Sequence, residues 1–128
     1  MADLKLIWVD DKPEAGPSIE FRVEPDLTIN SHRIVKSEYL ENGQYLIPTI
    51  RQINPSIILM DHNLNDIERN GAVLIAEVRL HFENIPIIYY STEMNEAMKS
   101  NALRFNSVYP IIRDDVAAEL LRIVKIYF

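Results

Sequence analysis

The chain alternates short apolar runs with segments whose apolar residues recur at helical spacing. Four runs have the length and the content of β-branched and aromatic residues that are typical of buried strands. These runs are Leu4–Val9, Ser56–Met60, Ile85–Tyr90 and Ser107–Ile112. Nearly continuous apolar strands occur where helices cover both faces of a parallel sheet, so the pattern predicts an α/β fold with a doubly wound sheet.

Helical periodicity lies between these runs and after the last one. The pattern predicts helices over Gly43–Ile53, Asn70–Phe82, Met94–Phe105 and Asp115–Tyr127. The spacing places Val73 on the buried face of one helix and Tyr127 on the buried face of the last one. Strands that alternate with helices in this way predict successive βαβ units.

The stretch after the first apolar run is the hardest part of the sequence to interpret. Lys12–Pro17 carries two prolines and a glycine, so no amphipathic helix fits directly after the first strand. Ser18–Val23 alternates like a strand, and Arg33–Glu38 is a second candidate for a short strand. Pro110 lies within the last apolar run, and because proline cannot donate to a ladder, that strand is expected at a sheet edge.

Length and composition narrow the class of protein. With 128 residues, of which 48% are hydrophobic, the chain fits one domain that spans residues 1–128. Cysteine is absent from the sequence, which excludes disulfides, thiolate metal cages and cysteine nucleophiles. A net charge of −6 opposes binding to nucleic acid. The apolar runs are too short to span a bilayer and Met1–Leu6 lacks a signal-peptide pattern, so we expect a cytoplasmic protein without a membrane partner.

Polar side chains follow the strands at the edge where a doubly wound sheet binds its ligands. Asp10 and Asp11 follow the first run, Asp61 follows the second, and Ser91 follows the third. Because adjacent strands lie about 4.8 Å apart, carboxylates at neighbouring strand ends repel each other unless a cation bridges them. Mg²⁺ prefers oxygen ligands, and Arg113 adds a positive charge after the last strand. Together these residues predict a site for Mg²⁺ and a phosphoryl group.

Each of these residues also has a purely structural interpretation. An Asp-Asp pair or a single Asp after a strand can simply begin a loop. Ser91 can be the N-cap of the following helix, and Arg113 can be a surface charge that pairs with Asp114. The combination of acid, acid, hydroxyl and cation at four strand ends favours the functional interpretation.

These segments resemble the receiver domain of two-component response regulators, a flavodoxin-like module that accepts a phosphoryl group on aspartate. The first strand and acidic pair of that family match LIWVDD. Its second helix and phosphoacceptor strand match ENGQYLIPTIRQINPSIILMD, and its fourth strand with the hydroxyl residue matches IPIIYYST. The resemblance covers most of the chain and implies a five-stranded parallel sheet in the order 2-1-3-4-5, here with a degenerate first helix.

The resemblance also implies a role for each site residue. Asp61 corresponds to the phosphoacceptor, Asp11 to a direct Mg²⁺ ligand and Asp10 to a ligand through water. Asn63 would offer its backbone carbonyl to the metal, and Ser91 would bind a phosphoryl oxygen. The implied partners are a histidine kinase or phosphotransfer protein and a downstream effector protein or fused output domain. Such a protein catalyses at most its own aspartyl phosphorylation and dephosphorylation.

Two alternatives to a phosphorylatable receiver remain open. Arg113 stands where the family has lysine, and Pro110 stands where it has a switch aromatic. These departures and the missing first helix motivate the alternative of a pseudo-receiver, a protein-interaction module that phosphorylation does not control. A metal-dependent phosphohydrolase is a third possibility, but such enzymes use a second acid two residues after the nucleophile, and Lys12 stands two residues after Asp10.

Overall fold

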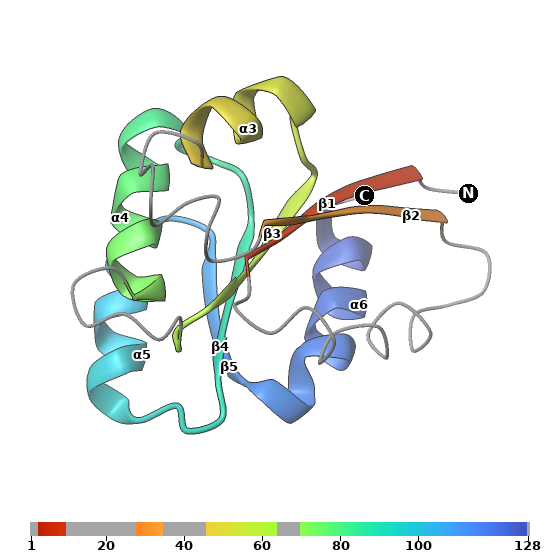
Figure 1. Cartoon of the computed structure of the whole chain (residues 1–128). Coiled ribbons are helices and arrows are strands. Elements are labelled where there is room, and N and C mark those ends of the chain that lie inside the picture. Colours follow the sequence, from red (N-terminus) through yellow and green to blue (C-terminus); the bar gives the residue numbers. More distant parts are fainter. Residues whose placement is uncertain (1–2, 10–27, 35–45, 64–69, 128) are drawn as a thin grey trace.

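The computed structural model describes residues 3–9, 28–34, 46–63 and 70–127. Five strands and four α-helices lie in these ranges, and a short 3-10 turn precedes the last helix (Figure 1). The strands are β1 (Asp3–Val9), β2 (Thr28–Ile34), β3 (Ile57–Asp61), β4 (Ile87–Ser91) and β5 (Val108–Ile112). The helices are α3 (Leu46–Ile53), α4 (Gly71–His81), α5 (Glu96–Leu103) and α6 (Val116–Tyr127), with the 3-10 turn η2 at Arg113–Asp115.

All neighbouring strands in the sheet pair in parallel. The order is β2-β1-β3-β4-β5, the same order as the receiver resemblance implies. In the register of β3 and β4, Asp61 lies opposite Tyr90. Because the strands are parallel, the carboxyl ends of β3, β4 and β5 lie at one edge of the sheet. The predicted α/β fold with a parallel sheet is confirmed.

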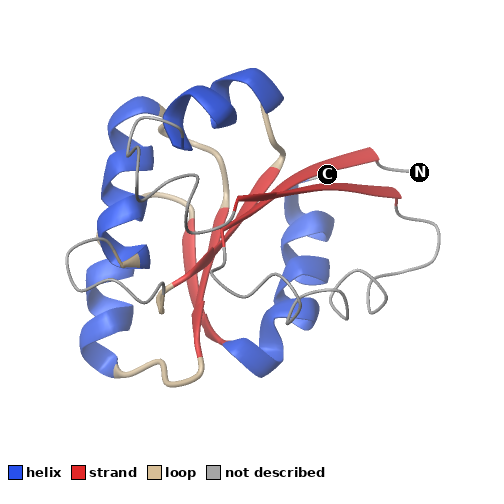
Figure 2. Ribbon diagram, in the orientation of Figure 1, coloured by secondary structure: helices blue, strands red, loops and turns tan. Residues whose placement is uncertain are grey.

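Helices cover both faces of this sheet (Figures 1 and 2). On one face, β-strand residues such as Met60 and Tyr89 form a core with buried side chains of α3, α4 and α5. On the other face, Trp8 and Tyr90 pack with buried residues of α6, including Leu120. Consecutive strand residues therefore face different cores, which explains why the strands contain almost no polar residues until they end. Among the described residues, no helix combines the length and the apolar character needed to cross a membrane.

The structure corrects several details of the sequence interpretation. The second strand is Thr28–Ile34, which overlaps Arg33–Glu38 at only two residues. Ser18–Val23 and the degenerate first helix fall outside the described residues. Val73 and Tyr127 were expected in the core, but both side chains are exposed, because α4 turns Leu74, Ile75 and Val78 inward and α6 ends at Tyr127. Pro110 lies in an edge strand, as its chemistry predicts.

Candidate functional site

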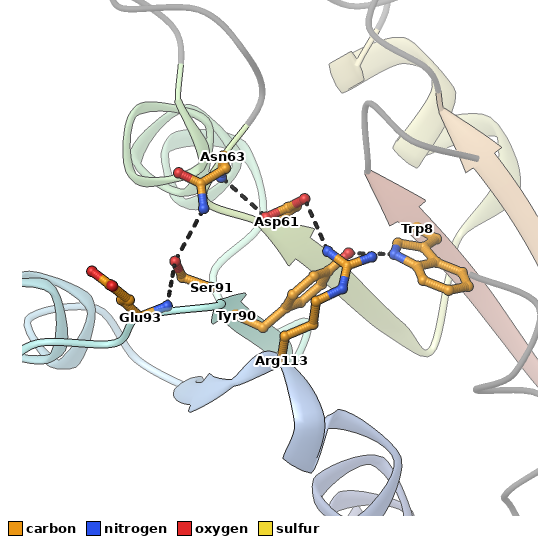
Figure 3. A network of polar contacts seen from close by, with 7 residues as sticks. All are labelled: Trp8, Asp61, Asn63, Tyr90, Ser91, Glu93 and Arg113. Atoms are coloured by element: carbon orange, nitrogen blue, oxygen red, sulfur yellow. Dashed lines mark hydrogen bonds and ion pairs between the residues drawn. The ribbon is translucent and has the colours of Figure 1, made fainter. Parts of the chain in front are cut away.

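Asp61 is a buried carboxylate at the carboxyl end of β3. Only 3% of the residue is exposed to solvent. Its Oδ1 accepts a hydrogen bond from the backbone N–H of Asn63 at 3.0 Å, and its Oδ2 faces Nη1 of Arg113 at 3.5 Å (Figure 3). A buried carboxylate requires polar partners, and here a backbone amide and a guanidinium provide them from two different segments.

Ser91 occupies the corresponding position at the end of β4. The residue is 3% exposed, and its hydroxyl oxygen accepts hydrogen bonds from Nδ2 of Asn63 at 3.2 Å and from the backbone N–H of Glu93 at 3.3 Å. Asn63 thus connects the ends of β3 and β4, because its backbone N–H binds Asp61 and its side-chain amide binds Ser91 (Figure 3). The alternative that Ser91 caps the next helix is wrong, because α5 begins at Glu96 and its N-cap is Asn95.

Arg113 follows β5 directly and begins η2. Its side chain is 26% exposed, so the guanidinium lies at the boundary between solvent and core. The group lies over the ring of Tyr90, with its carbon 5.4 Å from the ring centroid, and it pairs with Asp61 (Figure 3). Acid, hydroxyl and cation therefore meet at one sheet edge, as the sequence analysis predicted for Asp61, Ser91 and Arg113.

The first turn of α4 packs directly behind Asp61. Gly71 donates its backbone N–H to the carbonyl of His62 at 3.1 Å. A Cβ atom on Gly71 would lie 2.3 Å from the carbonyl oxygen of Asp61 and 2.8 Å from Cα of His62. Since real Cβ atoms do not come this close to backbone, glycine allows α4 to begin against the end of β3.

Tyr89 and His62 form a pair beside Asp61, and Tyr89 lies on the face of the sheet that α3, α4 and α5 cover. The Tyr89 hydroxyl and Nδ1 of His62 form a hydrogen bond, and the two rings meet edge to face with centroids 5.6 Å apart. Burial lowers the pKa of His62. Burial and, to a smaller extent, the Asp61 carboxylate raise the pKa of Tyr89 to about 12. Both groups are therefore held in their neutral forms beside the acidic residue.

The raised pKa of Tyr89 predicts a loss of stability in alkaline solution. An unfolded tyrosine ionises near 10.0, whereas folded Tyr89 stays neutral until about 12. The stabilisation is complete below the unfolded pKa, and the free energy of unfolding falls as the pH rises through this interval. Urea unfolding at successive pH values measures the decline, which we expect to be shallower in Tyr89→Phe. Equal declines in the two proteins would contradict the prediction.

Part of the expected metal site lies within the described residues. Asp61 and the Asn63 carbonyl supply oxygen atoms, the ligand type that Mg²⁺ takes, so the donors present fit this ion. Asp10 and Asp11, the other two expected ligands, fall outside the described residues. Within the described ranges, no group of three histidine or acidic side chains comes together as a metal site. The metal assignments therefore stay predictions.

Two residues of this network were missed by the sequence analysis. Trp8 and Tyr90 were interpreted only as members of apolar runs, yet the indole Nε1–H donates a hydrogen bond to the Tyr90 hydroxyl. The two residues are 82 positions apart, so no local pattern relates them. The available signal was the side-chain type, since a buried tyrosine or tryptophan needs a partner for its polar atom.

Comparison with known proteins gives a consistent result for the fold. No family model and no curated protein sequence matches the chain. Solved structures do match: the receiver domain of the Francisella response regulator 1452 has a TM-score of 0.70 at 19% identity, covering 97% of this chain and 95% of that one. The non-phosphorylated receiver domain of the Escherichia coli stress response regulator RcsB has a TM-score of 0.73 at 18% identity, covering 97% and 92%. The chain has the receiver-domain fold.

The same fold extends to a chemotaxis protein. Vibrio cholerae CheY4 matches this receiver fold with a TM-score of 0.69 at 15% identity, covering 99% of this chain and 100% of that chain. At such low identity, the likeness concerns the arrangement of the strands and helices. What this receiver fold does chemically has to be argued from its own residues.

Proposed function

We propose that this chain is a two-component receiver that accepts a phosphoryl group on Asp61. The observation that supports this most strongly is the environment of that carboxylate. It is buried at the end of β3, held by the Asn63 amide and paired with Arg113, with the Ser91 hydroxyl in the same network. Such an arrangement orients one oxygen nucleophile and surrounds it with groups that bind phosphoryl oxygens.

The reaction is a transfer between two nucleophiles. A carboxylate oxygen of Asp61 forms a bond to phosphorus, and the bond from phosphorus to the donor nitrogen of a phosphohistidine breaks. The electron pair of that bond leaves with the imidazole, and the product is an acyl phosphate on Asp61. Small acyl phosphates are chemically equivalent donors, in which a carboxylate leaves instead of an imidazole.

The residues of this chain position the reacting groups. Arg113 supplies a permanent positive charge that can bind phosphoryl oxygens through two N–H groups. Ser91 supplies a hydroxyl that can rotate to donate to a phosphoryl oxygen, while Asn63 fixes its place. Asp10, Asp11, Asp61 and the Asn63 carbonyl would hold Mg²⁺, which when bound neutralises charge on the transferring group. Hydrolysis of the acyl phosphate would return the chain to its starting state.

The proposed partners follow from this chemistry. A histidine kinase or phosphotransfer protein would supply the phosphohistidine, and an effector protein or fused output domain would respond to the modified receiver. The proposed chain is a switch and not an enzyme with an external substrate, because it acts on its own Asp61.

The decisive experiment is intact-mass measurement after incubation with Mg²⁺ and acetyl phosphate. We expect a gain of one phosphoryl group in the parent protein and none in Asp61→Asn. Asp114→Asn is a matched control, because Asp114 is an exposed carboxylate one residue after Arg113. This control should be modified like the parent. Equal modification of Asp61→Asn and the parent would refute the assignment of the acceptor.

A pseudo-receiver is the alternative, and the Arg113 contact gives it a specific basis. A guanidinium that pairs with Asp61 can neutralise the carboxylate as a fixed structural ion pair. A folded parent protein that gains no mass would favour this alternative. Beryllium fluoride supplies a second check, since a receiver domain of RcsB from Salmonella enterica has been solved in the presence of phosphomimetic BeF3−. Failure to bind this anion would also favour the pseudo-receiver.

A further inference from the structure

Two buried aromatic residues lie behind the acceptor site, on the face of the sheet that α6 covers. Trp8 in β1 and Tyr90 in β4 are both at most 1% exposed and belong to the same core. The Trp8 indole N–H donates to the Tyr90 hydroxyl across β3, which lies between their strands (Figure 3). The hydrogen bond fixes the position of the hydroxyl end of the Tyr90 ring.

The face of this fixed ring is in contact with the site. The Arg113 guanidinium carbon lies 5.4 Å from the Tyr90 ring centroid, within the range of a cation-π interaction. Another atom of the same guanidinium, Nη1, lies 3.5 Å from Oδ2 of Asp61. Arg113 is therefore in contact with an aromatic face and with a carboxylate, and the contact with the aromatic face does not depend on the charge of Asp61.

The contact with the Tyr90 ring matters because the ion pair between Arg113 and Asp61 changes during the proposed reaction. When a carboxylate oxygen of Asp61 becomes part of an acyl phosphate, the original ion pair is replaced by a contact with phosphoryl oxygens. Arginine has a long side chain that loses considerable conformational entropy when it is fixed. A ring that contacts the guanidinium before and after transfer reduces that loss in the reaction itself.

We propose that Tyr90 is a positioning residue that holds Arg113 for the phosphoryl group on Asp61, with Trp8 fixing the Tyr90 ring. The proposal rests on the proposed function and adds a residue to it. It also explains how arginine can serve where the receiver family has lysine, since the flat guanidinium stacks on an aromatic face and an ammonium does not. The ring belongs to β4, directly before Ser91, so the hydroxyl and the cation are positioned by one strand.

The test compares initial rates of phosphorylation by acetyl phosphate in variants of the whole chain. Tyr90→Leu removes the aromatic face, and we expect a rate about tenfold lower, within the range of a desolvated cation-π contact. Tyr90→Phe keeps the face and loses only the hydroxyl, so its rate should recover to within about threefold of the parent. Ile88→Ala is the control and should keep a rate near that of the parent, because Ile88 is equally buried in β4 and packs in the same core, two residues before Tyr90.

A double-mutant cycle separates positioning from damage to the core. If Tyr90 acts through Arg113, Tyr90→Leu should lower the rate in the parent but should have no further effect in Arg113→Met. A rate loss of the same size in both backgrounds would overturn the proposal, as would a Tyr90→Leu rate equal to the parent rate. If the parent itself takes up no phosphoryl group, the proposed function fails and this proposal fails with it.

Discussion

Gly71→Ala is expected to lower the free energy of unfolding by about 3 kcal/mol, an effect typical of severe overpacking. The added Cβ would lie 2.3 Å from the Asp61 carbonyl oxygen, and the obstructing atoms are backbone and not a flexible side chain. Relief requires either α4 or the end of β3 to move. Because the moved backbone carries Asp61, the proposed acceptor, we also expect phosphorylation to slow by about a hundredfold.

Urea unfolding and the acetyl phosphate assay measure the two effects of Gly71→Ala separately. Leu80→Ala in the same helix is the control, since Leu80 is 82% exposed and its truncation should change stability by less than about 0.5 kcal/mol. Parent-like stability in Gly71→Ala would contradict the close approach of α4 to β3.

Replacement of Arg79 by methionine is expected to have the second large effect on stability. The Arg79 guanidinium donates to four backbone carbonyls, those of Phe82, Ile85, Asn106 and Ser107, at distances from 2.6 to 3.2 Å. These carbonyls precede β4 and β5, so one side chain of α4 joins the beginnings of two strands. Arg79→Met keeps the aliphatic volume and leaves the carbonyls without this donor, and we expect a loss of about 2–4 kcal/mol.

Thermal and urea unfolding of three variants distinguish geometry from charge at this position. Arg79→Lys keeps the charge but not the forked donors, so its stability should fall between those of the parent and Arg79→Met. Arg104→Met removes an exposed arginine whose guanidinium lies over the Phe105 ring, and it should change stability by less than about 1 kcal/mol. Stability of Arg79→Met equal to that of Arg104→Met would refute the role of the four hydrogen bonds.

The strands of the central sheet could be predicted because burial on both faces leaves a clear trace in the sequence. All five residues of β3 and of β4 are buried, which matches the apolar runs that end at Asp61 and Ser91. The second strand was placed incorrectly because Thr28–Ile34 contains five polar residues and no apolar run. It is defined by seven backbone pairings with β1, and pairing of this kind depends on the partner strand and not on side-chain pattern.

In the candidate site too, residues with a local sequence pattern could be predicted and residues defined by contacts in the folded chain could not. Asp61, Ser91 and Arg113 could be selected because polar residues at strand ends contrast with the runs before them. Tyr90 could not be selected, because its ring satisfies the apolar pattern and its hydroxyl finds a partner only in the folded chain. Long-range contacts of this type are created by topology, so the sequence alone does not reveal which buried aromatic residue serves the site.

Pro110 has a consequence for how this protein can meet other chains. The Ser107 carbonyl accepts from the N–H of Ile87, so alternation along β5 directs the polar backbone groups of residues 109 and 111 toward β4 and those of Pro110 outward. The missing N–H therefore costs the sheet no internal hydrogen bond. It interrupts the outer rim instead, where an additional strand would have to pair. Edge-to-edge polymerisation through β5 is thereby disfavoured, because a strand that paired there would find no donor at Pro110.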